Sequence, residues 1–264
     1  MTNLNILIVE GNDPKNSEFF VKAAKASCSE NLKNLVLKLE PNSNIEIINP
    51  IRDDQTKIAL ENIKNYHGII FTGGALRLND MTDEIKKHIN FASNCFKYEN
   101  KILAICWGLQ VCSVAAGGKV APGKKGVHIG IASDIEINDE GKKNPIYKNK
   151  KLKFTSPAFN YDEVCEIPRG ATLLSSDKVN KVMGLNFMSG KSEIWGLQYH
   201  PDYEYWQMIN LSSARKDRIM KNSHLNNDND FQKHLDYIKE EDKKLDFKNR
   251  TCEIKNWLEI IKLH

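Results

Sequence analysis

Short runs of apolar residues alternate with amphipathic stretches through the first half of the chain. The apolar runs are residues 6–9, 45–48, 69–71 and 102–105. Runs that are apolar at every position, as residues 6–9, 69–71 and 102–105 are, are typical of strands buried on both faces of a sheet. The stretches between them, within residues 18–39, 57–65 and 81–98, have apolar positions at helical spacing. This alternation predicts an α/β fold with a doubly wound, mostly parallel open sheet and helices on both faces.

The pattern changes from residue 119 onward, where the apolar runs have the character of hairpin strands. These runs are residues 130–137, 172–175, 181–187 and 193–199. We expect them to extend the parallel sheet with mixed pairing. The complete sheet is then expected to be flavodoxin-like, with its ligand site outside the carboxyl ends of the parallel strands.

Residues 203–264 are charged and have helical periodicity, and an Asn- and Asp-rich break at residues 222–230 separates two helical stretches. We therefore divide the chain into a domain of residues 1–205 and a C-terminal helical extension of residues 206–264. The final apolar positions, Trp257, Leu258, Ile260 and Ile261, need a covering surface. We expect them to pack back on the same domain, and a partner protein or a homodimer contact is the alternative.

Composition narrows the function classes. The 264 residues are 41% hydrophobic, which is ample for the core of one α/β domain. The net charge of +4 comes from scattered lysines without arginine–aromatic interleaving, so we expect no nucleic-acid partner. The six cysteines show no close pairing, which argues against a metal site and a disulfide framework, and nothing suggests a cofactor. No apolar run approaches the roughly 18 residues of a membrane span, and no leader precedes the first strand, so we expect a cytoplasmic protein.

Cys106 directly follows the buried run 102–105 and directly precedes a helical pattern. A sharp turn from strand to helix lifts such a side chain out of the sheet, and the helix N-terminus behind it favours a thiolate or an oxyanion. Gly108 leaves this turn uncrowded. The alternative is a buried structural cysteine, so the assignment of Cys106 as a nucleophile depends on a partner histidine.

A candidate partner, His200, ends a second apolar run, and Asp202 follows two positions later. A nucleophilic thiol needs a base to take its proton, and the base needs an orienting group on its other nitrogen. Pro201 biases His200 toward an extended backbone at the end of its strand. Taken singly, His200 could be a surface residue and Asp202 a helix N-cap, but with Cys106 they form a candidate catalytic triad.

Two glycines, Gly73 and Gly74, lie just beyond the apolar run 69–71. Consecutive glycines allow backbone N–H groups to approach a substrate oxygen, as an oxyanion hole requires. The N–H of Trp107 is the candidate second donor. Because all three apolar runs end at the same edge of a parallel sheet, we expect the glycines, Cys106 and His200 to meet there.

Together these segments resemble the class I glutamine amidotransferase family, in which a strand ending in glycines, a C-x-G elbow and an H-P-E segment occur in this order. The resemblance runs from about residue 6 to residue 205. It is closest to stand-alone members related to the amidotransferase part of GMP synthetase, because the segments at residues 106–110, 115–120 and 195–201 are similar to theirs. Residues 1–205 are therefore expected to form a class I glutamine amidotransferase-like domain.

The resemblance implies a γ-glutamyl thioester on Cys106, with His200 acting first as base and then as acid and Asp202 as its orienting carboxylate. It also implies that the backbone N–H groups of Gly74 and Trp107 stabilise the oxyanion. The positions that it places beside the substrate are Gly73, Gln110, His128 and Asn160.

Three of these positions depart from the family's pattern. Asp202 replaces the usual glutamate, Asn160 stands where many members have histidine, and His128 stands where close relatives have glutamate. Because the segments of Asn160 and His128 border the substrate in the family, the identity of the γ-glutamyl substrate stays open.

Three functions are compatible with these residues. The first is a glutamine amidotransferase or glutaminase that passes ammonia to a separate synthase protein, since no synthase domain follows in this chain. The second is a hydrolase of γ-glutamyl peptides or γ-glutamyl amines that uses the same triad. The third is a non-catalytic regulatory homologue, against which the intact set of Cys106, His200 and Asp202 argues.

Overall fold

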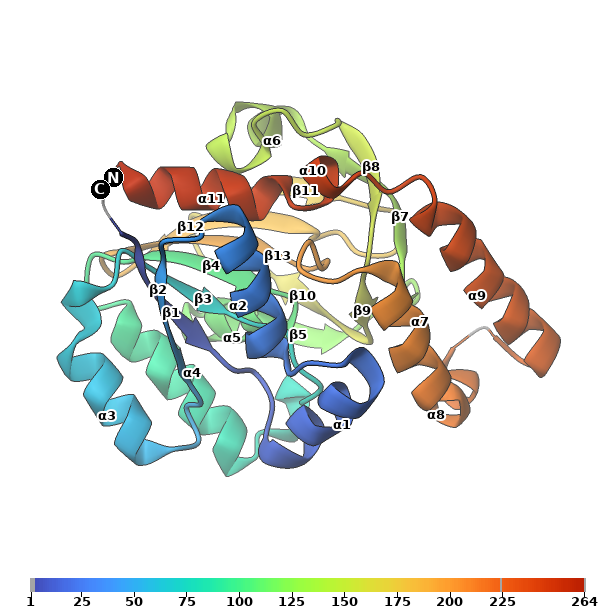
Figure 1. Cartoon of the computed structure of the whole chain (residues 1–264), viewed down its shortest axis with the longest axis horizontal. Helices are drawn as coiled ribbons and strands as arrows, with labels where there is room; N and C mark the ends of the chain where they lie inside the picture. The colour runs from blue at the N-terminus through green and yellow to red at the C-terminus, as the bar shows by residue number, and fades with distance from the viewer. Residues whose placement is uncertain (1–2, 224, 264) are drawn as a thin grey trace.

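A mixed nine-stranded sheet forms the centre of the computed structural model, which describes residues 3–223 and 225–263. One half of the sheet is parallel, and Figure 1 shows its strands running side by side. In spatial order these strands are β2 (Asn44–Ile48), β1 (Asn5–Val9), β3 (Gly68–Phe71), β4 (Lys101–Ile105) and β13 (Ser192–Leu197).

The other half of the sheet is antiparallel. It contains β12 (Gly184–Ser189), β11 (Thr172–Ser176), β7 (Ala132–Ile137) and β8 (Lys153–Ser156). Two small antiparallel ribbons lie outside the main sheet, and they pair β5 (Lys119–Pro122) with β10 (Asp162–Glu166) and β6 (His128–Ile129) with β9 (Phe159–Asn160). The prediction of a mostly parallel sheet extended by mixed pairing is confirmed, whereas the two ribbons were not predicted.

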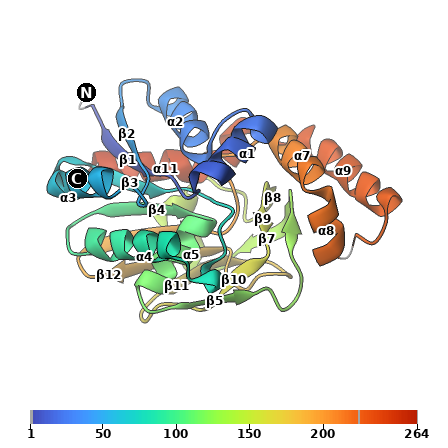
Figure 2. The same cartoon turned by 90° about the horizontal axis from the view of Figure 1, so that it is seen from below.

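Alternating residues of each parallel strand enter two separate cores. In β1, Ile6 and Ile8 join one apolar cluster, and Leu7 and Val9 join the other. Helices α2 (Cys28–Leu39) and α11 (Cys252–Lys262) cover the first cluster. Helices α3 (Asp53–Glu61), α4 (Asp83–Cys95) and α5 (Trp107–Ala115) cover the second, and Figure 2 shows α2 and the α4–α5 pair on opposite sides of the sheet.

The predicted helical region 18–39 is two helices rather than one. Helix α1 (Pro14–Ala24) ends at Lys25, whose φ of 67° is left-handed, and Ser27 caps the start of α2 with its side chain. The remaining short elements are η1 (Ile63–Asn65), η2 (Leu78–Asp80), α6 (Asp139–Lys143) and η3 (Pro145–Tyr147).

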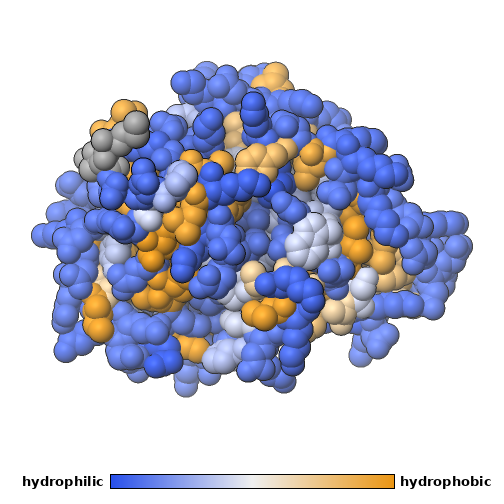
Figure 3. Space-filling view, in the orientation of Figure 1, coloured by the Kyte–Doolittle hydropathy of each residue, from blue (hydrophilic) through white to orange (hydrophobic). Residues whose placement is uncertain are grey.

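The C-terminal segment is helical, as predicted, and its last helix belongs to the main core. A Cβ on Gly68 of β3 would lie 2.6 Å from the ring of Trp257 in α11, so this helix lies directly on the sheet. The expectation that the final apolar residues pack back on the same domain is therefore confirmed. On the molecular face shown in Figure 3, hydrophilic side chains predominate. The preceding helices are α7 (Tyr205–Ala214), α8 (Lys216–Asn222), α9 (Asp228–Asp242) and α10 (Phe247–Arg250). Within residues 3–223 and 225–263, no helix has the length and apolar character needed to cross a membrane.

Candidate active site

Cys106 occupies a tight turn between β4 and α5. Its φ of 52° and ψ of −107° are unusual for a residue with a side chain, and such strain is typical of a nucleophile elbow. Its backbone N–H donates to the carbonyl oxygen of Leu197 in the neighbouring strand β13. A Cβ on Gly108 would lie 2.5 Å from the carbonyl oxygen of Phe71, so only glycine fits there. The structure thus has the elbow geometry that the sequence predicts.

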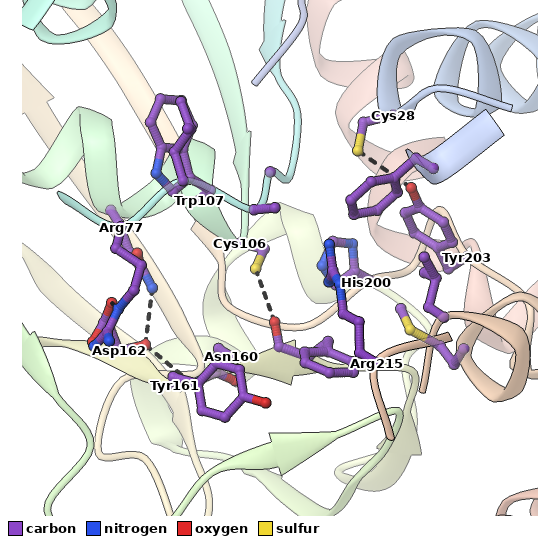
Figure 4. A pocket seen from close by; sticks show the side chains of 18 of the residues that line it. Cys28, Arg77, Cys106, Trp107, Asn160, Tyr161, Asp162, His200, Tyr203 and Arg215 are labelled. Carbon is purple, nitrogen blue, oxygen red and sulfur yellow. Dashed lines mark hydrogen bonds and ion pairs between the residues drawn. The ribbon is translucent and has the colours of Figure 1, made fainter. Parts of the chain in front are cut away.

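His200 follows β13, and its side chain and that of Cys106 enter the same cavity (Figure 4). The Nδ1 of His200 lies 3.0 Å from Oδ1 of Asp202. With Nδ1 as the donor, the shorter carboxylate orients the ring, and Nε2 remains for proton exchange with the thiol. A Cβ on Gly73 would lie 2.5 Å from Cε1 of His200, so the predicted substrate-binding residue Gly73 serves as the surface on which the imidazole packs.

The electrostatic setting of His200 favours its protonated form. Burial alone would lower the pKa of His200, but the charges of Cys106 and Asp202 and the hydrogen bond to Asp202 raise it to about 10. Around the sulfur, Cys106 Sγ donates to the carbonyl oxygen of Phe159 at 3.6 Å, and Gln198 Nε2 donates to Sγ at 3.6 Å. A histidine held protonated beside a thiol is able to stabilise a thiolate as an ion pair.

The two predicted oxyanion donors, Gly74 and Trp107, both line this cavity. Among the hydrogen bonds of the described residues, none uses the backbone N–H of either one. A Cβ on Gly74 would lie 2.8 Å from the carbonyl oxygen of Gly11, so a larger residue would displace the segment. Both N–H groups are therefore available to an oxygen that is bound above Cys106.

One end of the cavity carries a charged pair that the sequence analysis did not identify. Arg77 makes a bidentate ion pair with the buried carboxylate of Asp162, through Nε at 3.0 Å and Nη2 at 2.6 Å. The predicted substrate-binding residue Gln110 donates from Nε2 to the backbone oxygen of Asp162 at 2.9 Å. This end therefore presents a carboxylate and a guanidinium together, which complements the ammonium and carboxylate of an amino acid.

The structure brings Asn160 to the cavity, but His128 lies behind it. Asn160 Nδ2 donates to the backbone oxygen of Asp162, and its Oδ1 accepts from Nδ1 of His128 at 2.9 Å. On the other side of the ring, His128 Nε2 lies 2.8 Å from Oδ2 of the buried Asp177. The register of β6 and β9 sets this arrangement, because it places His128 opposite Asn160. His128 thus fixes the orientation of Asn160 and does not line the cavity.

Arg250 in α10 holds the loop that carries Asp202. Its Nη1 donates to the backbone oxygens of Pro201 at 2.9 Å and Tyr203 at 3.0 Å, and its Nη2 lies 3.3 Å from Oε1 of Glu204. The sequence did not reveal this role, because the partners are mainly backbone carbonyls almost 50 residues away. The C-terminal segment is therefore a structural part of the site.

Replacing Arg250 with methionine should destabilise the protein, because methionine preserves the apolar stem but leaves two buried carbonyl groups without donors. We expect a loss of about 1–3 kcal/mol in the free energy of unfolding, measured by urea titration. The matched control is Arg52→Met, since Arg52 is exposed and pairs with the exposed Asp54. Equal stability of the two variants would refute the role of Arg250.

Comparison with known proteins identifies the family of this chain. The sequence profile of the family "Glutamine amidotransferase class-I" matches residues 21–208. A γ-glutamyl-L-1-hydroxyisopropylamide hydrolase of Pseudomonas sp. is 27% identical over 220 residues, which cover 81% of this chain and 74% of that protein. A glutamine-hydrolyzing GMP synthase subunit of Methanoregula boonei is 31% identical over 143 residues, which cover 53% of this chain and 67% of that protein.

Gamma-glutamyl peptidase 5 of Arabidopsis thaliana is 31% identical over 148 residues, which cover 54% of this chain and 56% of that protein. Among solved structures, a glutamine amidotransferase of Thermotoga maritima superposes with a TM-score of 0.69 at 18% identity and covers 99% of both chains. The shared fold therefore extends beyond residues 1–205 into the C-terminal helices. Since the family profile matches most of the chain, this protein belongs to the class I glutamine amidotransferase family.

Proposed function

We propose that the protein is a γ-glutamyl hydrolase, which cleaves the amide bond between a γ-glutamyl group and an amine or amino acid. The Cys106 thiolate, whose proton is held on His200 Nε2, attacks the γ-carbonyl carbon. The resulting oxyanion accepts hydrogen bonds from the N–H groups of Gly74 and Trp107. His200 then returns its proton to the amide nitrogen, the C–N bond breaks and the amine leaves, with a γ-glutamyl thioester remaining on Cys106.

Water completes the reaction. His200, now neutral, takes a proton from the water molecule that attacks the thioester, and collapse of the second oxyanion breaks the C–S bond. Glutamate leaves, and Cys106 is again a thiolate beside a protonated His200. Through both steps the carboxylate of Asp202 orients the imidazole and stabilises its positive charge, which is consistent with the raised pKa of His200.

The charged end of the cavity supports the γ-glutamyl part of the proposal. The carboxylate of Asp162 suits the α-ammonium group of the glutamyl residue, and the guanidinium of Arg77 suits its α-carboxylate. Gln110 holds the backbone at Asp162, and so positions this pair. A γ-glutamyl group bound there would extend its side chain toward Cys106.

The observation that carries the choice of a hydrolase is that the cavity continues past Cys106 on the side of His200. Ammonia, the leaving group of glutamine, needs no such space. A larger amine does, and the apolar lining suits an organic group. Tyr203 contacts the His200 ring at 5.1 Å between ring centroids, and it shares an apolar cluster with three other lining residues, Phe20, Met208 and Leu211, while Arg215 lies over Phe20. The hydrolase of Pseudomonas, whose match covers 81% of this chain, supports the same choice.

A glutaminase that passes ammonia to a separate synthase is the second candidate. Its support is the similarity to the glutamine-hydrolyzing GMP synthase subunit of Methanoregula boonei, which spans about half of this chain. Both candidates use Cys106, His200 and Asp202 in the same way, and they differ only in the leaving group. The oriented triad argues against a non-catalytic role.

A comparison of substrates tests the proposal. We expect kcat/KM for γ-glutamyl-leucine or a γ-glutamyl alkylamine to exceed that for glutamine by about tenfold or more, because ammonia leaves the apolar end of the cavity unfilled. Glutamate release is measured for each substrate with the same enzyme preparation. Hydrolysis of glutamine alone, and its acceleration by a synthase protein, would contradict the hydrolase and establish the second candidate.

A further inference from the structure

Two arginines of the cavity lining have no acidic partner. Arg215 lies between α7 and α8, and Arg218 follows it within α8. Both line the cavity that contains Cys106. Across residues 3–223 and 225–263, no carboxylate lies within ion-pair distance of either guanidinium. By contrast, Arg77 at the opposite end of the cavity has an acidic partner, Asp162.

Aromatic rings hold the two guanidinium groups in place. The Cζ of Arg215 lies 4.5 Å from the ring centroid of Phe19, 5.1 Å from that of Phe20 and 5.7 Å from that of Phe159. The Cζ of Arg218 lies 5.3 Å from the ring centroid of Tyr161. Stacking of this kind fixes a guanidinium plane without using its N–H donors. The donors of both arginines therefore remain available to a ligand.

The electrostatics of this side favour an anion. Burial lowers the pKa of Arg215, and the neighbouring positive charge of Arg218 lowers it further, so each cation destabilises the other. A bound anion between them would relieve this repulsion, and a carboxylate matches the planar donors of a guanidinium in a bidentate geometry. Arg215 is half-buried, so such a contact is less screened by solvent than one on the surface.

The position of the pair identifies which part of a substrate would carry the anion. In Figure 4, Arg215 lies on the His200 side of Cys106, whereas Arg77 and Asp162 lie on the other side. A substrate with its γ-glutamyl head on Asp162 and Arg77 and its scissile bond at Cys106 therefore extends its leaving group toward Arg215. The apolar side chains of Met208 and Leu211 also line the cavity, and they cluster with Phe20, over which Arg215 lies.

We propose that Arg215 and Arg218 bind the α-carboxylate of a leaving amino acid, so that the preferred substrate is a γ-glutamyl dipeptide with a free, apolar C-terminal residue. This inference rests on the proposed function and makes it more specific. It distinguishes the protein from a hydrolase of neutral γ-glutamyl amines. The carboxylate is bound through charge-assisted hydrogen bonds from the two guanidinium groups, and the apolar side chain of the leaving residue contacts Met208 and Leu211.

The test compares γ-glutamyl-leucine with γ-glutamyl-leucine amide, which differ in charge and hardly at all in shape. We expect kcat/KM of the unaltered enzyme to be about ten- to a hundredfold higher for the acid. Arg215→Gln should reduce this ratio to about one, and Arg218→Gln should reduce it in part because Arg218 is exposed. The control Arg52→Gln, at an exposed site far from the cavity lining, should preserve the full ratio.

Equal kcat/KM values for the acid and the amide would overturn the carboxylate site while leaving the hydrolase intact. An unchanged ratio in Arg215→Gln, with both substrates slowed equally, would also overturn it, because that result indicates a purely structural role for Arg215. Calorimetry with Cys106→Ala separates the two proposals. If Cys106→Ala binds the acid more tightly than the amide but the unaltered enzyme turns over neither, the carboxylate site is supported and the hydrolase is refuted. Equal binding of the acid and the amide would refute the carboxylate site.

Discussion

Replacing Cys106 with alanine should lower kcat/KM for every γ-glutamyl substrate by about a thousandfold or more. Without the sulfur no thioester forms, and water must attack the amide directly, aided only by the oxyanion donors and by binding. Glutamate release under single-turnover conditions measures the effect. Alanine has the same Cβ as cysteine, so the backbone at φ 52° between β4 and α5 is no more strained in the variant.

Cys112→Ala is the matched control for this experiment. Cys112 lies in the same helix, α5, but it is completely buried, and burial raises the pKa of its thiol well above the ordinary value. This variant should therefore keep the activity within a few-fold while confirming that α5 tolerates loss of a thiol. Comparable losses in the two variants would show that Cys106 acts through packing and not through chemistry.

The second large effect is expected for Asp202→Asn, with a loss of roughly ten- to a thousandfold in kcat. Asp202 Oδ1 is the acceptor for His200 Nδ1, and its Oδ2 has no hydrogen-bond partner, so the carboxylate acts on the triad through one contact. An amide of the same size preserves the packing but removes the negative charge. The imidazolium of His200 then loses stabilisation in both proton-transfer steps.

The direction of the accompanying pH effect follows from the same charge. The negative charge of Asp202 contributes to the raised pKa of His200, which is about 10. Removing that charge lowers the pKa of His200, so the protonated acid form should be lost at a lower pH than in the unaltered enzyme. The alkaline limb of the kcat profile is therefore expected to move to lower pH in Asp202→Asn.

Glu204→Gln is the control for Asp202→Asn. The carboxylate of Glu204 accepts from Trp206 Nε1 and pairs with Arg250, and it makes no hydrogen bond with His200. We expect this variant to keep its kcat within about threefold and its alkaline limb in place. Unchanged turnover in Asp202→Asn would mean that another group orients His200, and a large loss in Glu204→Gln would identify it.

Features encoded by neighbouring residues could be predicted from the sequence. The parallel strands are rich in apolar residues, and Cys106, Gly74 and His200 each follow one of them. A parallel sheet with a shared edge therefore brings these three residues together. The elbow at Cys106 is likewise local, because strand β4, Cys106 and helix α5 follow one another directly in the chain. The fold class and the meeting of these residues follow from such patterns.

Features that depend on pairing between distant segments could not be predicted. Arg77 and Asp162 are 85 residues apart, and only the folded chain places η2 beside the ribbon of β5 and β10. The stacking of Arg215 on Phe20 joins α7 and α8 to α1 in the same way. His128 was expected beside the substrate, but the register of β6 and β9 places it behind Asn160. In each case the residue type is visible in the sequence and its partner is not.

Trapping the acyl-enzyme is the most direct test of the central claim that Cys106 is the nucleophile of a γ-glutamyl hydrolase. The enzyme is quenched in acid during turnover of γ-glutamyl-leucine, digested and mapped by mass spectrometry, with Cys112 as the internal control. We predict a γ-glutamyl adduct on Cys106 alone, present during turnover and lost when the substrate is exhausted. Release of glutamate with Cys106 unmodified and an adduct on another residue would contradict the account.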